Sequence, residues 1–140
     1  MDIDIQELDR KKRFLKRYKK NLALIDRLES KVTNLDERIK NIRSPVISDM
    51  PRGGTPVSKE DILADKLEVE DRIRRLKKKG LTYKREIIDV IDELDDTRYA
   101  EILESFCIDC KSLEEIADDN GYTLRHIKRL YSEAVISVDI

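Results

Sequence analysis

The chain opens with a long segment in which apolar residues recur every three or four positions. The segment runs from about Ile5 to Arg43 and contains no glycine or proline. This spacing puts the apolar side chains on one face of a helix, as in a coiled coil. The positions on this face are Tyr18, Leu22, Ile25, Leu28, Val32, Leu35, Ile39 and Ile42.

A second segment, from about Lys59 to Leu94, repeats this spacing. Ser58 and Asp61 are placed to cap its start. Gly80 interrupts it, at a cost of about 1 kcal/mol relative to alanine, and could mark a kink. Its apolar positions are Leu63, Leu67, Ile73, Leu76, Tyr83, Ile87, Ile91 and Leu94.

A linker at 44–58 separates the two segments. All three prolines and two of the four glycines lie within it, so helix cannot persist and an antiparallel hairpin is the simplest arrangement. The linker is either a flexible connection or an ordered segment that docks on a partner or on DNA. Two helices of about 55 Å that bury a single apolar face leave little core in a monomer, so we expect a homodimer through the coiled region.

The last thirty residues predict a helix-turn-helix. Ser112 and Glu115 form a capping box for a first helix, Gly121 can end it in the left-handed conformation, and Thr123 can cap a second helix. Apolar residues of the second helix face those of the first: Ile127, Leu130 and Ala134 face Leu113, Ile116 and Ala117. The opposite face of the second helix, which is suited to contact a DNA major groove, carries Leu124, Arg125, Lys128, Arg129 and Ser132.

This segment resembles region four of primary sigma factors, from Ser112 to Ala134 in one register without a gap. Asn120 stands where the family usually has an apolar residue, and Leu124 stands where it has an arginine. The DNA-sequence specificity of the sigma family therefore does not carry over to this chain. The resemblance implies promoter-reading positions at Leu124, Arg125, His126, Lys128 and Arg129, and with them we expect DNA contacts from Ser112 and Thr123.

The whole chain is also similar to small phage-encoded proteins of Gram-positive hosts, a group that includes late-gene transcription activators. The similarity rests on Ser48–Gly54, on Lys84–Ile88 and on the helix-turn-helix. It implies a regulator of transcription that acts on DNA, on host RNA polymerase or on both.

The formal net charge of −1 conceals an uneven distribution. Residues 10–43 hold 13 Lys/Arg and 4 Asp/Glu, a net of +9, whereas residues 97–140 hold 5 and 9, a net of −4. An acidic helix-turn-helix binds DNA weakly alone and would gain from a second basic contact. The candidates for that contact, which otherwise form a solvated helix face, are Arg10, Lys11, Lys12, Arg13, Lys16 and Arg17. A second basic cluster with the same two interpretations contains Arg72, Arg74, Arg75 and Lys77–Lys79.

Residues with catalytic or metal-binding chemistry are few. Cys107 and Cys110 form a CxxC with no second ligand pair, so buried free cysteines are expected if the segment is helical. His126, the only histidine, is interpreted as a surface or phosphate-contact residue. Asp89, Asp92 and Glu93 are expected on a solvated face, and we expect no enzyme, metal or cofactor.

Composition completes the prediction. With 42% charged and 5% aromatic residues, the chain suits elongated helices with narrow apolar faces. No stretch approaches the roughly 20 apolar residues of a membrane span, so we expect no membrane partner and a location in the cytoplasm of a bacterial host cell.

The sequence therefore predicts an all-α protein: an elongated helical hairpin or coiled coil at 1–95, then a three-helix module at 96–140 whose first helix spans about 96–109. The predicted function is that of a phage-type transcriptional regulator that binds double-stranded DNA, with RNA polymerase contact. One alternative is a protein-interaction module that modulates RNA polymerase or a sigma factor without reading DNA. Another is a DNA-packaging recognition subunit, which would form a closed ring.

Overall fold

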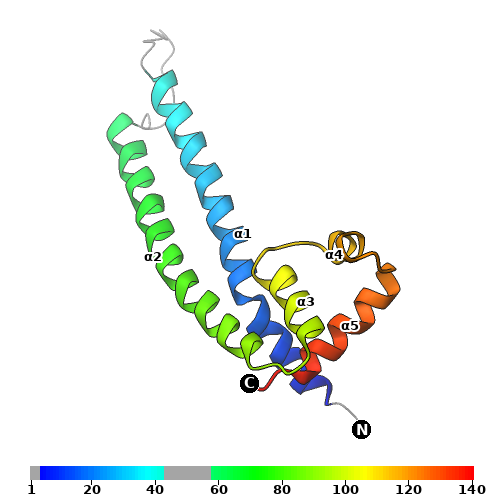
Figure 1. Cartoon of the computed structure of the whole chain (residues 1–140). Helices are drawn as coiled ribbons and strands as arrows, with labels where there is room; N and C mark the ends of the chain where they lie inside the picture. The colour runs from blue at the N-terminus through cyan, green and yellow to red at the C-terminus, as the bar shows by residue number, and fades with distance from the viewer. Residues whose placement is uncertain (1–3, 43–57) are drawn as a thin grey trace. The chain divides into compact units, whose positions relative to one another are not determined.

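The computed structural model describes residues 4–42 and 58–140, and this part of the chain forms five α-helices and no strand (Figure 1). The helices are α1 (Ile5–Asn41), α2 (Lys59–Asp92), α3 (Thr97–Cys107), α4 (Leu113–Asn120) and α5 (Leu124–Ser137). The all-α prediction is confirmed, and each long helix ends within two residues of its predicted end. The predictions on the linker at 44–57 lie outside the described residues.

Side-chain caps fix where α2 and α3 begin. The Ser58 hydroxyl accepts a hydrogen bond from the Asp61 amide at 3.2 Å, and the Asp61 carboxylate accepts one from the Ser58 amide at 3.4 Å. This reciprocal pair is the predicted cap of the second segment. The Asp96 carboxylate accepts from the Arg98 amide at 2.9 Å and starts α3.

The chain divides into two compact units. One comprises residues 23–78, and the other comprises residues 1–22 together with 79–140. The predicted domains at 1–95 and 96–140 stay a prediction.

Within residues 23–78, the described parts of α1 and α2 form an antiparallel pair. Lys66 pairs with Asp36 at 2.6 Å and Lys77 with Glu29 at 3.4 Å, so later residues of α2 meet earlier residues of α1. The apolar residues between the two helices are all less than 10% exposed; they are Ile25, Leu28, Leu35, Ile62, Val69 and Ile73. One chain thus buries this apolar face by itself, and homodimerisation stays a prediction.

The predicted apolar face of α2 is wrong at its first two positions. Leu63 is 38% exposed and Leu67 is 64% exposed, whereas Ile62 and Val69 are buried. Ile62, Val69, Ile73 and Leu76 are separated by seven, four and three residues, which keeps a heptad spacing. Ile62 and Leu63 are neighbours, so choosing the wrong one rotates the predicted face by about 100°.

In the other unit, the first turns of α1 and the last turns of α2 share a core with α3, α4 and α5. Arg17 pairs with Glu86 at 2.7 Å and lies over the rings of Phe14 and Tyr83. The buried residues of this core are Leu15, Ile87, Ile91, Ile102, Leu103, Cys107, Ile116, Ala117, Ile127, Leu130, Tyr131, Ala134, Val135 and Val138.

The start of α1 also holds the end of the chain. Arg10 donates a hydrogen bond to the backbone carbonyl of Ile140 at 2.8 Å, and Lys11 donates to the carbonyl of Ile136 at 2.8 Å. Carbonyls in the last turn of a helix lack partners within the helix and carry partial negative charge, so a lysine there is stabilising. Figure 1 shows the C-terminal end of the chain beside the first turns of α1.

Candidate nucleic-acid interface

The first helix of the predicted helix-turn-helix is α4, and it is capped at Ser112 as predicted. The Ser112 hydroxyl accepts a hydrogen bond from the Glu115 amide at 3.1 Å, and the Glu115 carboxylate lies 3.3 Å from the same hydroxyl. Ile116 and Ala117 are buried in the core, whereas Glu114 and Glu115 are exposed. Ser112 itself is half-buried, with its side chain engaged in the cap.

The turn between α4 and α5 depends on Gly121. Its φ of 69° and ψ of 27° lie in the left-handed region, as predicted. The Tyr122 amide donates to the Ala117 carbonyl at 2.9 Å, and the Gly121 amide donates to the Asp118 carbonyl at 3.4 Å. These bonds satisfy carbonyls in the last turn of α4, so the chain reverses directly into α5.

Thr123 caps α5, since its hydroxyl accepts a hydrogen bond from the His126 amide at 3.1 Å. The buried face of α5 comprises Ile127, Leu130, Tyr131, Ala134 and Val135. The predicted packing of this helix on Ile116 and Ala117 is confirmed.

The opposite face of α5 carries the predicted DNA-contacting residues. Arg125, Lys128 and Arg129 are exposed, whereas Leu124 and His126 are half-buried. Within the described residues, Arg125 and Lys128 make no ion pair. Thr123, Arg125, His126 and Arg129 line one shallow depression on this face.

The side chain of Arg129 is held along α5 by contacts that the sequence did not predict. Its guanidinium lies 3.1 Å from His126 Nδ1, and its Nε lies 3.9 Å from the Glu133 carboxylate. The other carboxylate oxygen of Glu133 accepts a hydrogen bond from the Tyr99 hydroxyl of α3 at 2.8 Å, which raises the pKa of that phenol. The four-residue spacing of Arg129 and Glu133 was the only sequence signal for this contact.

His126 also meets Tyr122 edge-to-face, with ring centroids 4.9 Å apart. Tyr122, the residue after the turn glycine, is 43% exposed. The aromatic pair therefore sits at the exposed N-terminal end of α5, next to Arg125 and Arg129.

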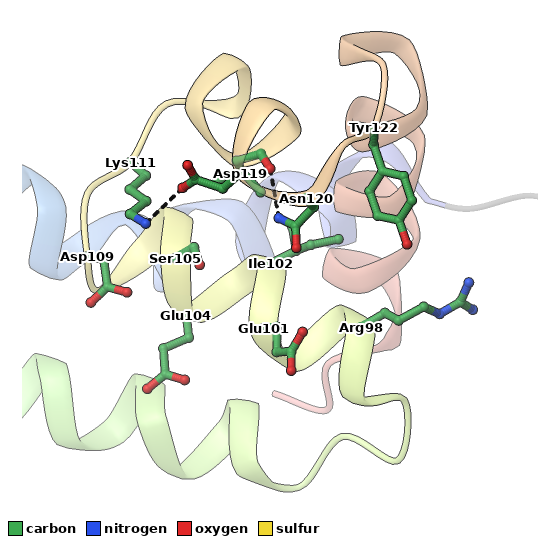
Figure 2. Close-up of a pocket in the computed structure, with 11 residues that line it drawn as sticks. Arg98, Glu101, Ile102, Glu104, Ser105, Asp109, Lys111, Asp119, Asn120 and Tyr122 are labelled. Atoms are coloured by element: carbon green, nitrogen blue, oxygen red, sulfur yellow. Dashed lines mark hydrogen bonds and ion pairs between the residues drawn. The ribbon is translucent and has the colours of Figure 1, made fainter.

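A polar cleft of about 300 Å³ lies between α3 and α4 (Figure 2). In the figure, Arg98 and Tyr122 lie at one end, and Asp109 and Lys111 at the other. Lys111 pairs with Asp119 at 2.9 Å, and this hydrogen bond raises the pKa of the lysine. The Asn120 amide donates to the Ile116 carbonyl at 2.7 Å, which explains how a polar residue fits before the turn glycine.

The remaining charge in the cleft is negative. Glu101, Glu104 and Asp109 are exposed and make no ion pair in the described part of the chain. Arg98, at one end of the cleft, pairs at 3.1 Å with Asp96, which does not line the cleft. The α3–α4 cleft is therefore acidic, whereas the exposed face of α5 is basic.

The six residues predicted to form a second basic contact fall into two groups in the structure. Arg10, Lys11 and Arg17 bond within the protein, to Ile140, Ile136 and Glu86. Lys12, Arg13 and Lys16 are exposed or half-buried, and the described part of the chain gives them no ion pair. In the second basic cluster, Arg74 and Arg75 pair with Asp71, and Lys77 pairs with Glu29.

The two cysteines occupy different environments. Cys107 ends α3 in the core at 1% exposed, as expected, and burial raises the pKa of its thiol to about 12. Cys110 is exposed beyond the helix, with a φ of 59°, so the expectation of a buried helical pair is wrong for this residue. Both are free, and no group of three or more His, Cys, Asp and Glu residues in the described ranges could hold a metal. Asp89, Asp92 and Glu93 are exposed, as predicted.

Fold and site together define an all-α protein in which α4 and α5 are joined by a short turn at Gly121, and none of its described helices is both long and apolar enough to cross a membrane. The chain belongs to the family described as "Protein of unknown function (DUF1492)", which matches residues 41–137. It is also similar to "Peroxisomal and mitochondrial division factor 2" of Arabidopsis thaliana, at 30% identity over 94 residues. That match covers 67% of this chain and 27% of the plant protein. No solved structure matches the chain.

Proposed function

We propose that this protein is a non-enzymatic, phage-type regulator of transcription that binds double-stranded DNA through α5. The observation that carries the proposal is the exposed face of α5, where Arg125 and Lys128 are free of ion pairs in the described part of the chain. Arginine and lysine are the side chains that most often contact guanine edges and phosphates in a major groove. The resemblance to sigma region four supports the proposal, since the two caps and the left-handed glycine fall in the same register.

The charge of the module sets how DNA binding would work. Residues 97–140 carry a net charge of −4, and nonspecific affinity for DNA comes mainly from neutralised phosphates. A single module would therefore bind weakly, and useful affinity needs further contacts. Homodimerisation and contact with RNA polymerase are two such sources.

The experiment is binding of the purified protein to duplex fragments tiled across its own genomic neighbourhood, at low and near-physiological salt. The test variant carries Arg125→Ala, Lys128→Ala and Arg129→Ala. A matched control removes three α2 cations that lie outside the second basic cluster and make no ion pair in the described residues: Lys59→Ala, Lys84→Ala and Arg85→Ala. The proposal predicts one fragment bound selectively at the higher salt, with binding lost in the test variant and kept in the control. Weak, salt-sensitive binding that the test variant retains would contradict it.

A second candidate is a protein-interaction module that modulates RNA polymerase or a sigma factor without reading DNA. The unpaired carboxylates of Glu101, Glu104 and Asp109 in the α3–α4 cleft favour it, because they suit a basic partner better than they suit DNA. Retention of purified bacterial RNA polymerase without DNA, lost on Glu101→Gln and Glu104→Gln, would support this candidate.

The likeness to a division factor covers too little of that protein to support a role in division here.

A further inference from the structure

Two sides of α1 are occupied within the unit that contains its first turns. One side meets α2, where Arg17 pairs with Glu86. Another meets α3 and α5, where the Lys19 ammonium lies 4.0 Å from the centre of the Phe106 ring and Lys11 bonds to Ile136. Leu15 is fully buried between these elements.

The remaining side of α1 is basic. Arg13, Lys16 and Lys20 are three and four residues apart and so share one face, which we call the α1 basic face. Arg13 and Lys20 are exposed and Lys16 is half-buried. None of the three forms an ion pair in the described residues; Arg13 Nε bonds at 3.4 Å to the backbone carbonyl of Asp9, which leaves its charge uncompensated.

The stretch of α1 in the other unit has a similar composition. Arg27, Lys31 and Arg38 are exposed there, and the described residues give them no ion pair. Their spacings of four and seven residues place them on one face of that stretch. Basic, unpaired side chains are therefore a property of α1 as a helix and are not confined to its first turns.

We propose that the α1 basic face binds the phosphate backbone of duplex DNA, independently of its base sequence. The inference rests on the proposed function only in taking DNA as the ligand, since it uses residues on a different helix. Duplex DNA carries one negative charge per roughly 1.7 Å of its axis, which suits a row of cations on successive helical turns. The α1 basic face has no exposed aromatic or large apolar residue between Asp9 and Ala23, so it lacks the anchors of a protein interface.

The test measures binding to a random-sequence 30-base-pair duplex across a series of salt concentrations. The test variant carries Arg13→Gln, Lys16→Gln and Lys20→Gln, which keep much of each side chain's length. The matched control carries Lys59→Gln, Lys84→Gln and Arg85→Gln, three α2 cations outside the second basic cluster, and so has the same net charge. Circular dichroism establishes that both variants are folded.

The proposal predicts that the slope of log Kobs against log salt becomes shallower by about 2–3 in the test variant, because each lost phosphate contact removes about 0.9. The control keeps the natural slope. Equal slopes in the two variants would overturn the proposal. So would binding of poly-glutamate as tight as that of DNA and equally sensitive to the test substitutions, because it would indicate an acidic protein partner.

The Arg125, Lys128 and Arg129 triple-alanine variant separates this inference from the proposed function. Loss of selective binding in that variant, with an unchanged slope in the α1 variant, would leave the proposed function standing and overturn the inference. A changed slope in the α1 variant, with no effect of the α5 substitutions, would support the inference and contradict the proposed function.

Discussion

Gly80 of α2 lies directly against the side chain of Asn21 of α1. A Cβ atom added at Gly80 would overlap the amide nitrogen of Asn21, which is 6% exposed and is the one buried polar residue among those described. Asn21 stands four residues before Ile25 and seven before Leu28, at a position that continues the apolar spacing of α1. A buried asparagine at such a position fixes the register of paired helices, and the missing side chain of Gly80 makes room for it.

Replacing Gly80 with alanine should therefore destabilise the protein, although alanine favours helix by about 1 kcal/mol over glycine. Asn21 is buried, so its amide has little room to move away from the added methyl group. Urea unfolding followed by circular dichroism measures the effect.

The control for this prediction is the same change in an Asn21→Ala background. There the methyl group meets no amide, and Gly80→Ala should become stabilising by about 1 kcal/mol. A stabilising effect of Gly80→Ala in the natural background would contradict the steric explanation.

The buried face of α2 allows a second prediction. Ile62→Ala should lower the free energy of unfolding by about 2–4 kcal/mol, because Ile62 is 5% exposed and its removal leaves a cavity. Leu67→Ala should change it by less than about 0.5 kcal/mol, since Leu67 is 64% exposed. The same urea titration distinguishes the two, and a larger effect at Leu67 would restore the face predicted from sequence.

The features that the sequence predicted correctly are mainly local. The caps at Ser58, Ser112 and Thr123 and the turn at Gly121 depend on residues within five positions of one another, so their chemistry can be read directly from the chain. The apolar spacing likewise predicted both long helices.

The features that were missed depend on distant contacts or on a choice between neighbours. Ile62 and Leu63 are equally apolar, and only the position of α1 decides which is buried. Arg10 and Lys11 bond to residues more than 120 positions away, so they appeared only as part of a basic run. Tyr99 and Glu133 lie on different helices, and their hydrogen bond had no sequence signal.

Gly121 supports a third prediction, on the turn of the helix-turn-helix. Gly121→Ala should destabilise the protein by about 1 kcal/mol, because an alanine pays a penalty at a φ of 69°. No atom lies within 4 Å of the added Cβ, so the backbone alone sets this cost. Gly121→Asn is the control and should cost less, since asparagine tolerates the left-handed region. Equal losses in thermal unfolding would argue against a backbone origin.

The two thiols should react at very different rates. At pH 8 Cys110 is exposed and should be modified by a disulfide reagent, whereas Cys107 is buried with its thiol pKa raised to about 12 and should not. We expect one reactive thiol in the folded protein and two in urea. The Cys110→Ser variant should show none until it unfolds, and a reactive thiol in that folded variant would contradict the burial of Cys107.

The same pKa shift makes stability depend on alkaline pH. The ordinary thiol pKa of 9.0 applies to the unfolded chain, and the folded value is about 12, so the folded state favours the neutral thiol. The contribution of Cys107 to stability is therefore complete below pH 9 and is lost as the pH rises toward 12. Tyr131 acts in the same direction, because burial raises its pKa from 10.0 to about 12. Urea midpoints measured from pH 7 to pH 11 should fall above pH 9, and less steeply in Cys107→Ala.

Glu133 should restrain DNA binding by α5, if the proposed function holds. Its carboxylate lies 3.9 Å from Arg129 and places a negative charge beside the exposed basic face. Glu133→Gln removes this charge but keeps an oxygen that can accept the hydrogen bond of Tyr99. We expect duplex DNA to bind about two- to fivefold more tightly, since an exposed ion pair is worth up to about 1 kcal/mol. Tyr99→Phe is the control: it loses the hydrogen bond, keeps the charge and should not tighten binding. An equal gain in both variants would show that release of α5 from α3 is responsible, and not the charge of Glu133.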